Sequence, residues 1–226
     1  MDKVIIVGGG LAGLISAILL QKGGKKVKLF EKRKYPFHRV CGEYVSNEAL
    51  PFLKSLGIPV EAHSPSHINR LTVTSESGRK LEANLEMGGF GLSRYILDDL
   101  LFRHAQRIGV EFIFAKVNTI DFVAKHFEIR AEEDVHIADI ALAAYGKRSN
   151  LDQKLKRDFF YRRSPYLGVK YHIRTDLAHN LIRLDNFKGG YSGVCKIEDD
   201  KFNLCYLSEA INLKQCSSIQ IGRAHV

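Results

Sequence analysis

The stretch "VIIVGGGLAGLISAILL", residues 4–20, decides the fold of this chain. It is too short for a membrane span, and glycines interrupt its apolar run. It also fails as a secretory signal peptide, because Asp2 and Lys3 cancel in charge and no small-residue cleavage site precedes the charged residues from Lys22 onward. The remaining interpretation is a strand, a turn and a helix.

The residues around this stretch agree with that interpretation. The β-branched run at residues 3–7 is typical of a buried parallel strand, and the glycines after it break the strand. Apolar residues then recur at helical spacing until Gly23 and Gly24 end the helix. A second strand follows at residues 26–31, so the first thirty residues predict a βαβ unit.

Gly8, Gly10 and Gly13 form the pattern G-x-G-x-x-G between the predicted strand and helix. Glycine permits the tight turn, brings the backbone close to a pyrophosphate and lets the helix pack on the strand. The helix N-terminus offers unpaired N–H groups to phosphates. Glu31 ends the second strand, where its carboxylate can bind a ribose. Together these features predict a dinucleotide site.

The same residues narrow the choice of dinucleotide. Glu31 disfavours a ribose 2′-phosphate, because two anions would face each other. Residues 32–34 are basic and could hold such a phosphate, but a solvated basic turn explains them more simply, so NADP is disfavoured. FAD and NAD both remain open.

Composition bounds the remaining function classes. The 226 residues carry a net charge of +9, with 45% hydrophobic and 26% charged residues, which is ordinary for a globular protein. The basic residues are scattered, so we expect no nucleic-acid partner. The four cysteines lie far apart without metal-ligand spacing, which predicts free thiols, no metal site and a cytoplasmic protein.

Further along the chain, hydrophobic spacing predicts additional elements. A helix is expected at residues 46–57 with Ser46 as N-cap, and a β-hairpin at 68–85. Residues 93–109 form the clearest amphipathic helix, with Ser93 at its N-cap position. Strands are predicted before residue 150 and again after residue 160, so we place a domain boundary near 150–160.

Three segments carry a family resemblance: "CGEYVSNEAL" (41–50), "GLSRYILDDLLFRHAQRIGVEF" (91–112) and "ADIALAAYGKRSNLD" (138–152). With the glycine motif they resemble the FAD-dependent oxidoreductases of the geranylgeranyl reductase and aromatic-hydroxylase superfamily. The resemblance implies an α/β fold: a Rossmann-type FAD-binding domain at 1–152, a hairpin insertion at about 66–90 that belongs to a substrate-domain sheet, and a further part of that sheet at 153–218.

The resemblance also implies roles for individual residues. The glycine turn would wrap the FAD pyrophosphate, Glu31 and Lys32 would border the adenosine ribose, and Arg94 would reach the phosphates or ribityl chain. The backbone of Val117 would pair with adenine, and residues 39–43 would lie near the isoalloxazine, with Glu43 either a proton carrier or a solvated carboxylate. The implied cofactor-binding residues are Gly8, Gly10, Leu11, Ala12, Gly13, Glu31, Lys32, Arg39, Cys41, Arg94, Val117 and Gly146.

A second flavin fingerprint of the family corresponds to "AAYGKRS", residues 143–149. Gly146 and Ser149 match it, whereas Ala143 stands where glycine is common and Tyr145 replaces an aspartate. Because that aspartate helps to hold FAD and the reduced nicotinamide, the replacement argues against hydroxylase-style docking of NAD(P)H and favours a reductase-like member.

We therefore expect an FAD-dependent, reductase-like enzyme with NAD(P)H as electron donor and a lipophilic, prenyl-type substrate. The alternatives are an FAD-dependent monooxygenase acting on an aromatic or polyene substrate, and a truncated nucleotide-binding module without activity. Peripheral membrane contact is compatible with the charge, and the catalytic acid and the oligomeric state stay unassigned. The ending "QIGRAHV" matches the translation of a sequencing adapter, so we expect a non-native tail at 219–226 and a truncation near Ser218.

Overall fold

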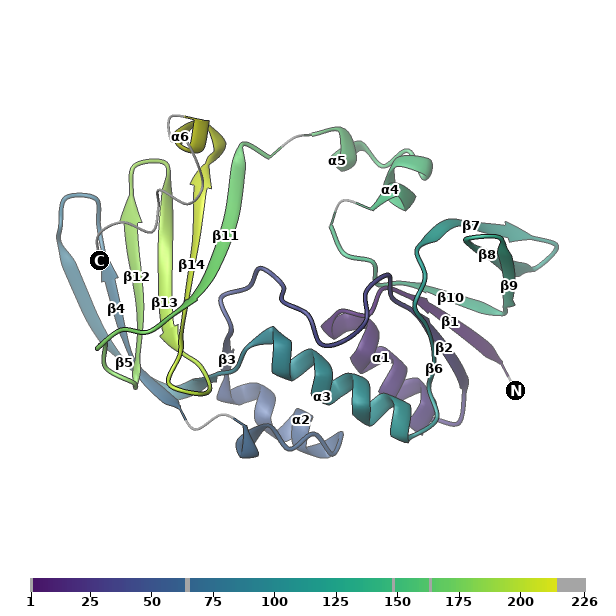
Figure 1. The fold of residues 1–226 in the computed structure, drawn as a ribbon, viewed down its shortest axis with the longest axis horizontal. Coiled ribbons are helices and arrows are strands. Elements are labelled where there is room, and N and C mark those ends of the chain that lie inside the picture. The colour runs from purple at the N-terminus through teal and green to yellow at the C-terminus, as the bar shows by residue number, and fades with distance from the viewer. Residues whose placement is uncertain (1, 64–65, 148, 163, 215–226) are drawn as a thin grey trace. The chain divides into compact units, whose positions relative to one another are not determined.

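The computed structural model describes residues 2–63, 66–147, 149–162 and 164–214 (Figure 1). The predicted tail, the truncation point and Cys216 lie outside these residues. The described chain forms two compact units. The first comprises residues 1–37, 55–58 and 95–162, and the second comprises residues 38–54, 59–94 and 163–226, each within the described part.

The first unit is built on the predicted βαβ unit. Four parallel strands lie in the order β10-β1-β2-β6, and helix α1 (Leu11–Lys22) connects β1 to β2. Helix α1 ends at Gly23, as the glycine pair predicts. The strands are β1 (Lys3–Val7), β2 (Lys26–Phe30), β6 (Glu111–Ile113) and β10 (Ile140–Ala143). The predicted α/β, Rossmann-type fold is confirmed.

A three-stranded antiparallel sheet, β7-β8-β9, completes the core of the first unit. Its strands are β7 (Val117–Val123), β8 (His126–Ala131) and β9 (Asp134–Ala138). Ile129 and Ala131 of β8 pack in one cluster with Ile5 and Val7 of β1 and with Phe30 of β2. This apolar contact fixes the end of β1 that leads into the glycine turn.

Helix α3 (Arg94–Arg107) is the amphipathic helix that the sequence predicts. Leu97, Leu101 and Ala105 are buried as its core stripe, while Ile96 and Leu100 are half-buried. The remaining short helices are η1 (Asn47–Ala49), α2 (Leu50–Ser55), η2 (Val60–Ala62), α4 (Asn150–Lys154), α5 (Asp158–Tyr161) and α6 (Ala210–Lys214). At η1, Ser46 Oγ accepts a hydrogen bond from the Glu48 amide at 3.3 Å, which confirms the predicted cap.

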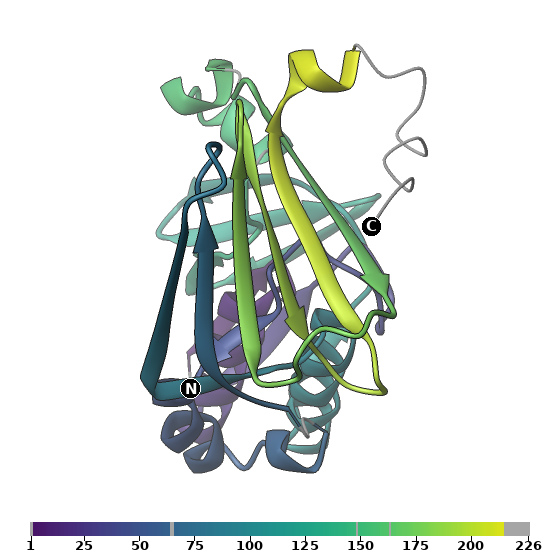
Figure 2. The same cartoon turned by 90° about the vertical axis from the view of Figure 1, so that its left-hand side faces the viewer.

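The second unit is a seven-stranded sheet in the order β11-β14-β13-β12-β4-β5-β3, whose long strands Figure 2 shows side by side. All neighbouring pairs are antiparallel except β12 and β4. The strands are β3 (Tyr44–Ser46), β4 (His67–Thr74), β5 (Lys80–Gly91), β11 (Tyr166–Ile173), β12 (Leu181–Phe187), β13 (Gly190–Lys196) and β14 (Phe202–Glu209). The predicted hairpin is β4–β5, whereas sequence reasoning missed β12.

The two faces of this sheet differ in chemistry. Paired residues point to the same face, so the register places Lys170, Cys205, Gly193, Leu184 and Val73 on one rung across five strands. The adjacent rung on that face carries His172, Asn203, Cys195, Ile182 and Leu71. We call this side the Glu43 face, for the residue that contacts its charged end, and define it by these ten residues.

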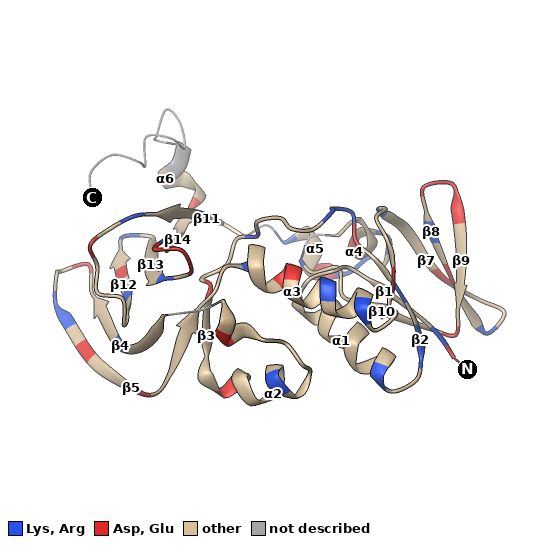
Figure 3. Cartoon of the chain, turned by 60° about the horizontal axis from the view of Figure 1, so that its bottom comes forward, with Lys and Arg blue, Asp and Glu red and all other residues tan. Residues whose placement is uncertain are grey.

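The opposite face is held by polar contacts. Thr74 Oγ1 donates to Asp185 Oδ1 at 2.6 Å, and Arg183 pairs with Asp185 at 2.8 Å. Lys and Arg residues are spread over strands, helices and loops of both units with Asp and Glu among them (Figure 3). Among the described residues, no helix has both the length and the apolar character that crossing a bilayer requires.

The core of the first unit makes a stability prediction. Replacing Ile129, which is fully buried, with alanine should lower the free energy of unfolding by roughly 2–5 kcal/mol, because a cavity remains where the side chain packed. The matched control is Ile137→Ala on β9, where 56% of the residue is exposed and little packing is lost. Urea denaturation followed by circular dichroism measures both. Equal losses in the two variants would contradict the packing of β8 against β1 and β2.

Candidate functional site

The turn after β1 is closed by contacts that exclude side chains. Gly8 has φ +108°, which favours glycine, and its amide donates to the carbonyl of Phe30 at 2.8 Å. A Cβ at Gly8 would collide with the backbone of Ala144, and a Cβ at Gly13 would collide with the carbonyl of Gly8. These two glycines let the strand, the turn and the helix approach each other as the motif requires.

The N-terminus of α1 is open to an anion. Gly10 is the N-cap residue with an extended conformation, no side chain caps the helix, and its first turn holds no acidic residue. The first intrahelical bond runs from the Leu14 amide to the Gly10 carbonyl at 2.9 Å. The N–H groups of residues 11–13 therefore have no acceptor within the helix and point out of its N-terminus. This is the arrangement that binds phosphate. These residues fit a dinucleotide diphosphate.

Glu31 steadies this turn from the end of β2. It is buried, with 6% exposure; its Oε2 accepts the Gly9 amide at 3.0 Å and its Oε1 accepts the Arg33 amide at 3.2 Å. The Tyr35 hydroxyl donates to the carbonyl of the same residue, Gly9. The acid thus lies beside the glycine turn as predicted, and the neighbouring Lys32 is exposed. Its contact with a ribose stays a prediction.

The second fingerprint brings an unexpected carboxylate into the first unit. Gly146 has φ +74° with open space around it, and Ser149 caps α4 in a capping box with Asp152. Asp152 is fully buried; its Oδ1 accepts the Tyr145 hydroxyl at 3.2 Å and pairs with Arg157 at 3.2 Å. Burial, together with this carboxylate, raises the pKa of Tyr145. The hydroxyl of Tyr145 is therefore bound to a buried carboxylate.

Val117 lies at the start of β7 and is buried in the core of the first unit. Asn150 Nδ2 lies 3.4 Å from the Val117 carbonyl and 3.2 Å from the Asn118 carbonyl, to which it donates. The side chain of Val117 serves packing, and the pairing of its backbone with adenine stays a prediction.

In the second unit, residues 38–43 lie against the Glu43 face of the sheet. Asn203 Nδ2 donates to the carbonyls of Cys41 at 3.2 Å and Gly42 at 2.8 Å. Cys195 Sγ, on the same rung of the face, donates to the Gly42 carbonyl at 3.4 Å. The segment is thus held through its backbone, which fixes the position of the next residue, Glu43.

Glu43 is the most heavily engaged acid of the second unit. Its Oε1 accepts from Lys170 Nζ at 2.6 Å and from the Arg94 amide at 2.8 Å, and its Oε2 lies 2.7 Å from His172 Nε2. The residue is 1% exposed and has φ +55°, a strained conformation for a non-glycine residue. Burial would raise the pKa of this carboxyl, but hydrogen bonds from His172, Lys170 and Arg94 outweigh burial and lower it. Glu43 is therefore a buried carboxylate, and the alternative that it is a solvated loop residue is wrong.

Three free thiols accompany this cluster: Cys41, Cys195 and Cys205. Burial, with Cys205, Glu43 and Cys41 nearby, raises the pKa of Cys195 to about 12, and burial likewise raises the pKa of Cys205. Cys195 and Cys205 therefore stay protonated at neutral pH and are poor nucleophiles. Among the described residues, no group of His, Cys, Asp or Glu is arranged to hold a metal ion.

The predicted residues thus fall into two groups. The first unit contains Gly8, Gly10, Leu11, Ala12, Gly13, Glu31, Lys32, Val117 and Gly146, and the second contains Arg39, Cys41 and Arg94. Sequence reasoning missed Asp152, Lys170 and His172. The alternation in "YLGVKYHI" places Lys170 and His172 on one face of a strand, but only the sheet register reveals that Glu43 lies beside them.

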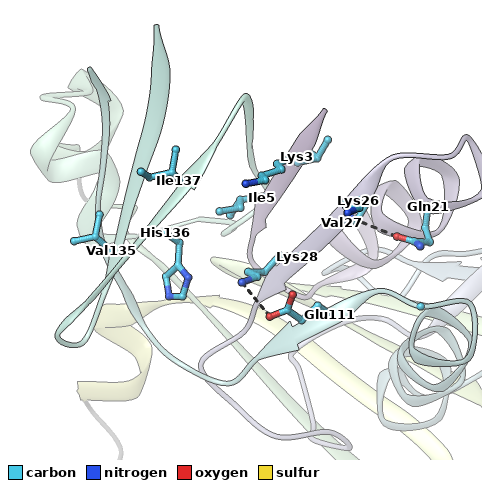
Figure 4. Close-up of a pocket in the computed structure, with 12 residues that line it drawn as sticks. Lys3, Ile5, Gln21, Lys26, Val27, Lys28, Glu111, Val135, His136 and Ile137 are labelled. Carbon is cyan, nitrogen blue, oxygen red and sulfur yellow. Dashed lines mark hydrogen bonds and ion pairs between the residues drawn. The ribbon is translucent and has the colours of Figure 1, made fainter. Parts of the chain in front are cut away.

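A separate cavity of about 590 Å³ lies at the other end of the parallel sheet (Figure 4). Its lining includes Lys3 of β1, Lys28 of β2 and His136 of β9, and Lys28 pairs with Glu111 at 3.0 Å. The cavity is lined by residues 3–5 of β1 and 26–28 of β2, the amino-terminal parts of these strands, whereas the glycine turn follows the carboxyl end of β1. Because α/β sheets bind ligands beyond the carboxyl ends of their strands, the cavity is not the dinucleotide site.

The charge of Glu43 predicts a pH-dependent stability. Glu43→Gln should lower the free energy of unfolding at pH 7 by roughly 3–5 kcal/mol, because it leaves Lys170 buried without its counter-charge. Folding lowers the pKa of the Glu43 carboxyl below its ordinary value of 4.5. Such a group stabilises the folded protein when the pH is above 4.5, and this stabilisation is lost as the pH falls through the folded-state pKa. The difference between wild type and variant should therefore shrink below pH 4.5.

Urea denaturation at a series of pH values measures this difference. The exposed Glu76, in the turn between β4 and β5, provides the control variant Glu76→Gln, for which no such pH trend is expected. A constant difference between Glu43→Gln and wild type down to acid pH would show that Glu43 is not ionised in the folded protein.

Comparison with known proteins places these features in a family. Putative FAD-dependent monooxygenase YetM of Bacillus subtilis is 31% identical over 124 residues, 51% of this chain and 34% of YetM. Conditioned medium factor receptor 1 of Dictyostelium discoideum is 27% identical over 123 residues, 48% of this chain and 24% of the receptor. The chain thus spans about a quarter to a third of these relatives.

Solved structures share the fold. The flavin-dependent halogenase CmlS superposes with a TM-score of 0.80 over 99% of this chain and 45% of its own, at 18% identity. The sequence pattern of the FAD binding domain family matches residues 1–159, which is more than half of the chain and contains both the glycine turn and the second fingerprint. The chain therefore belongs to the FAD binding domain family.

Proposed function

We propose that this chain is the FAD-binding part of an FAD-dependent monooxygenase that hydroxylates an aromatic or polyene substrate. The observation that carries the proposal is the open N-terminus of α1, where no side chain caps the helix and Gly8 and Gly13 leave room only for backbone. A bound FAD diphosphate would satisfy these amides. Membership of the FAD binding domain family supports the same cofactor.

The relatives favour the monooxygenase over the prenyl reductase that we expected first from the sequence. YetM, 31% identical, is named a putative FAD-dependent monooxygenase, whereas neither YetM nor the halogenase CmlS is named a geranylgeranyl reductase. Tyr145, which replaces the fingerprint aspartate and argued for the reductase, donates a hydrogen bond to the buried Asp152. The lipophilic substrate and NAD(P)H as electron donor stay part of the proposal.

The residues of the first unit would hold the cofactor. The amides of Leu11, Ala12 and Gly13 would bind the diphosphate, and Glu31 would accept hydrogen bonds from the ribose while it holds the Gly9 amide. FAD, when bound, supplies the redox chemistry by which electrons from a nicotinamide donor reduce molecular oxygen and one oxygen atom enters the substrate. Val117 and Gly146 complete the proposed cofactor contacts of the first unit, while contacts of Arg39, Cys41 and Arg94 in the second unit stay predictions from the sequence.

The N-cap position offers a test in which cofactor binding and protein stability change in opposite directions. Gly10→Asp should cap α1 and preserve or raise the melting temperature of the protein without FAD, because aspartate is a favourable N-cap residue. The same carboxylate should weaken FAD binding by at least about tenfold, since it occupies the anion position and repels the diphosphate. Flavin fluorescence during titration measures the affinity.

Gly10→Asn is the matched control, because asparagine caps a helix equally well without the charge. It should weaken FAD binding less than Gly10→Asp. Equal FAD affinity in wild type and Gly10→Asp, with both proteins folded, would refute the diphosphate site at this helix.

The reaction itself is tested on the full chain loaded with FAD. With NADH or NADPH and an aromatic or polyene substrate under ¹⁸O₂, we expect one heavy oxygen atom in the product, measured by mass spectrometry. Saturation of a prenyl double bond without oxygen would establish the reductase instead. Halogenated product in the presence of bromide or chloride would establish a halogenase, and FAD binding with none of these reactions would leave only a nucleotide-binding module.

A further inference from the structure

We propose that His172 is a general base for an ionisable hydroxyl group, a phenol or an enol, with Lys170 beside it to hold the resulting oxyanion and Glu43 as the positioning residue of both. The inference concerns the substrate of the proposed function and rests on it. It is carried by the contacts of the second unit alone.

Glu43 is itself unsuited to take a proton. Its two oxygens already accept from Lys170, the Arg94 amide and His172, at 2.6, 2.8 and 2.7 Å. Its side chain is fully buried and its backbone is strained, so a substrate has no access to it. A carboxylate that holds an imidazole in this way fixes the tautomer and orientation of the ring and stabilises the imidazolium.

His172 is the histidine that Glu43 holds, and its second ring nitrogen is the candidate base. Because Nε2 faces Glu43, the neutral imidazole held by this contact carries its proton on Nε2, and Nδ1 is the basic nitrogen. Among the described residues, none forms a hydrogen bond with Nδ1, and the side chain is 17% exposed. Nδ1 is thus the ring nitrogen that is left for a substrate.

Residues 38–43 are attached to the sheet without the charged contacts of Glu43. Asn203 and Cys195 already bind the carbonyls of Cys41 and Gly42 to the sheet. Buried ion pairs contribute little net stability compared with apolar packing. The Glu43 contacts therefore add chemistry to a segment that is already anchored.

A second histidine, His38, lies beside His172. The ring of His38 lies edge-on to the ring of His172, with centroids 5.1 Å apart, and His38 is exposed. Burial, Lys170 and His172 lower the pKa of His38, against the opposing effects of Glu43 and Glu198. Lys170, His172, Glu43 and Glu198 are thus among the titratable groups that influence the pKa of His38.

The rungs of the Glu43 face indicate the rest of the substrate. Lys170 and His172 lie on β11, and the same two rungs pass through Cys205 and Asn203 of β14 to the apolar side chains of β12 and β4. Three strand spacings separate β11 from β12, which is about 14 Å. We therefore infer a mainly apolar molecule with its ionisable hydroxyl group at one end.

The step balances without an electron transfer. The substrate O–H bond breaks, its proton forms an N–H bond at His172 Nδ1, and the electron pair stays on oxygen as a phenolate or enolate. The ammonium group of Lys170 then lies beside the oxyanion, and Glu43 faces the imidazolium.

Ionisation of 4-nitrophenol tests the inference on the full chain loaded with oxidised FAD. Phenolate absorbance is followed as a function of pH, with protein in excess of the probe. Wild type should lower the midpoint pH of ionisation by about one unit, a tenfold gain in phenolate. His172→Gln should reduce this shift to the part that Lys170 contributes, while Gln can still donate to Glu43. Glu43→Gln should also reduce the shift, because the imidazolium loses its counter-charge.

His67→Gln is the matched control, because His67 is an exposed histidine on β4 of the same unit. It should ionise the probe as wild type does, and circular dichroism verifies that each variant is folded. An unchanged midpoint in wild type, failure of the probe to bind, or a wild-type shift in folded His172→Gln would overturn the inference. Since FAD retention is measured in the same samples, its loss would count against the proposed function instead.

Discussion

The absence of a side chain at Gly13 is the constraint on which the cofactor unit depends. A single methyl group there would collide with the carbonyl of Gly8, and one at Gly8 would collide with the backbone of Ala144. The start of α1 therefore reaches both the end of β1 and the chain that follows β10. The result is that three backbone segments meet where the helix N-terminus is open, so the site is made of peptide groups and tolerates few substitutions.

The second unit contains a buried carboxylate, that of Glu43. Three hydrogen-bond donors surround it, and two of them are the ionisable side chains of Lys170 and His172 on one strand. Such a charge is costly to bury unless all its partners are in place. The strain at Glu43 and the backbone contacts of Cys41 and Gly42 show that the chain is bent to bring this one side chain to the sheet.

The parts that the sequence predicts well are those encoded locally. The βαβ unit, the hairpin β4–β5 and the stripe of α3 each follow from spacing within a few residues. Strand β12 was missed because "LIRLDNF" alternates only briefly between long polar stretches. The partners of Glu43 were out of reach for another reason: Lys170 and His172 are 127 and 129 positions away, and only the pairing of distant strands brings them together. Likewise, no local pattern shows that Asp152 engages Tyr145, seven positions earlier.

The attachment of residues 38–43 has a consequence for how the protein can diversify. Asn203 and Cys195 grip main-chain carbonyls, which every amino acid possesses, so the path of the segment does not depend on the side chain at position 41. The exposed Val40 and the half-buried Cys41 can therefore be exchanged while the carboxylate that follows keeps its place. Positions 40 and 41 are thus two sites where a change of side chain leaves the hydrogen bonds that attach the segment intact.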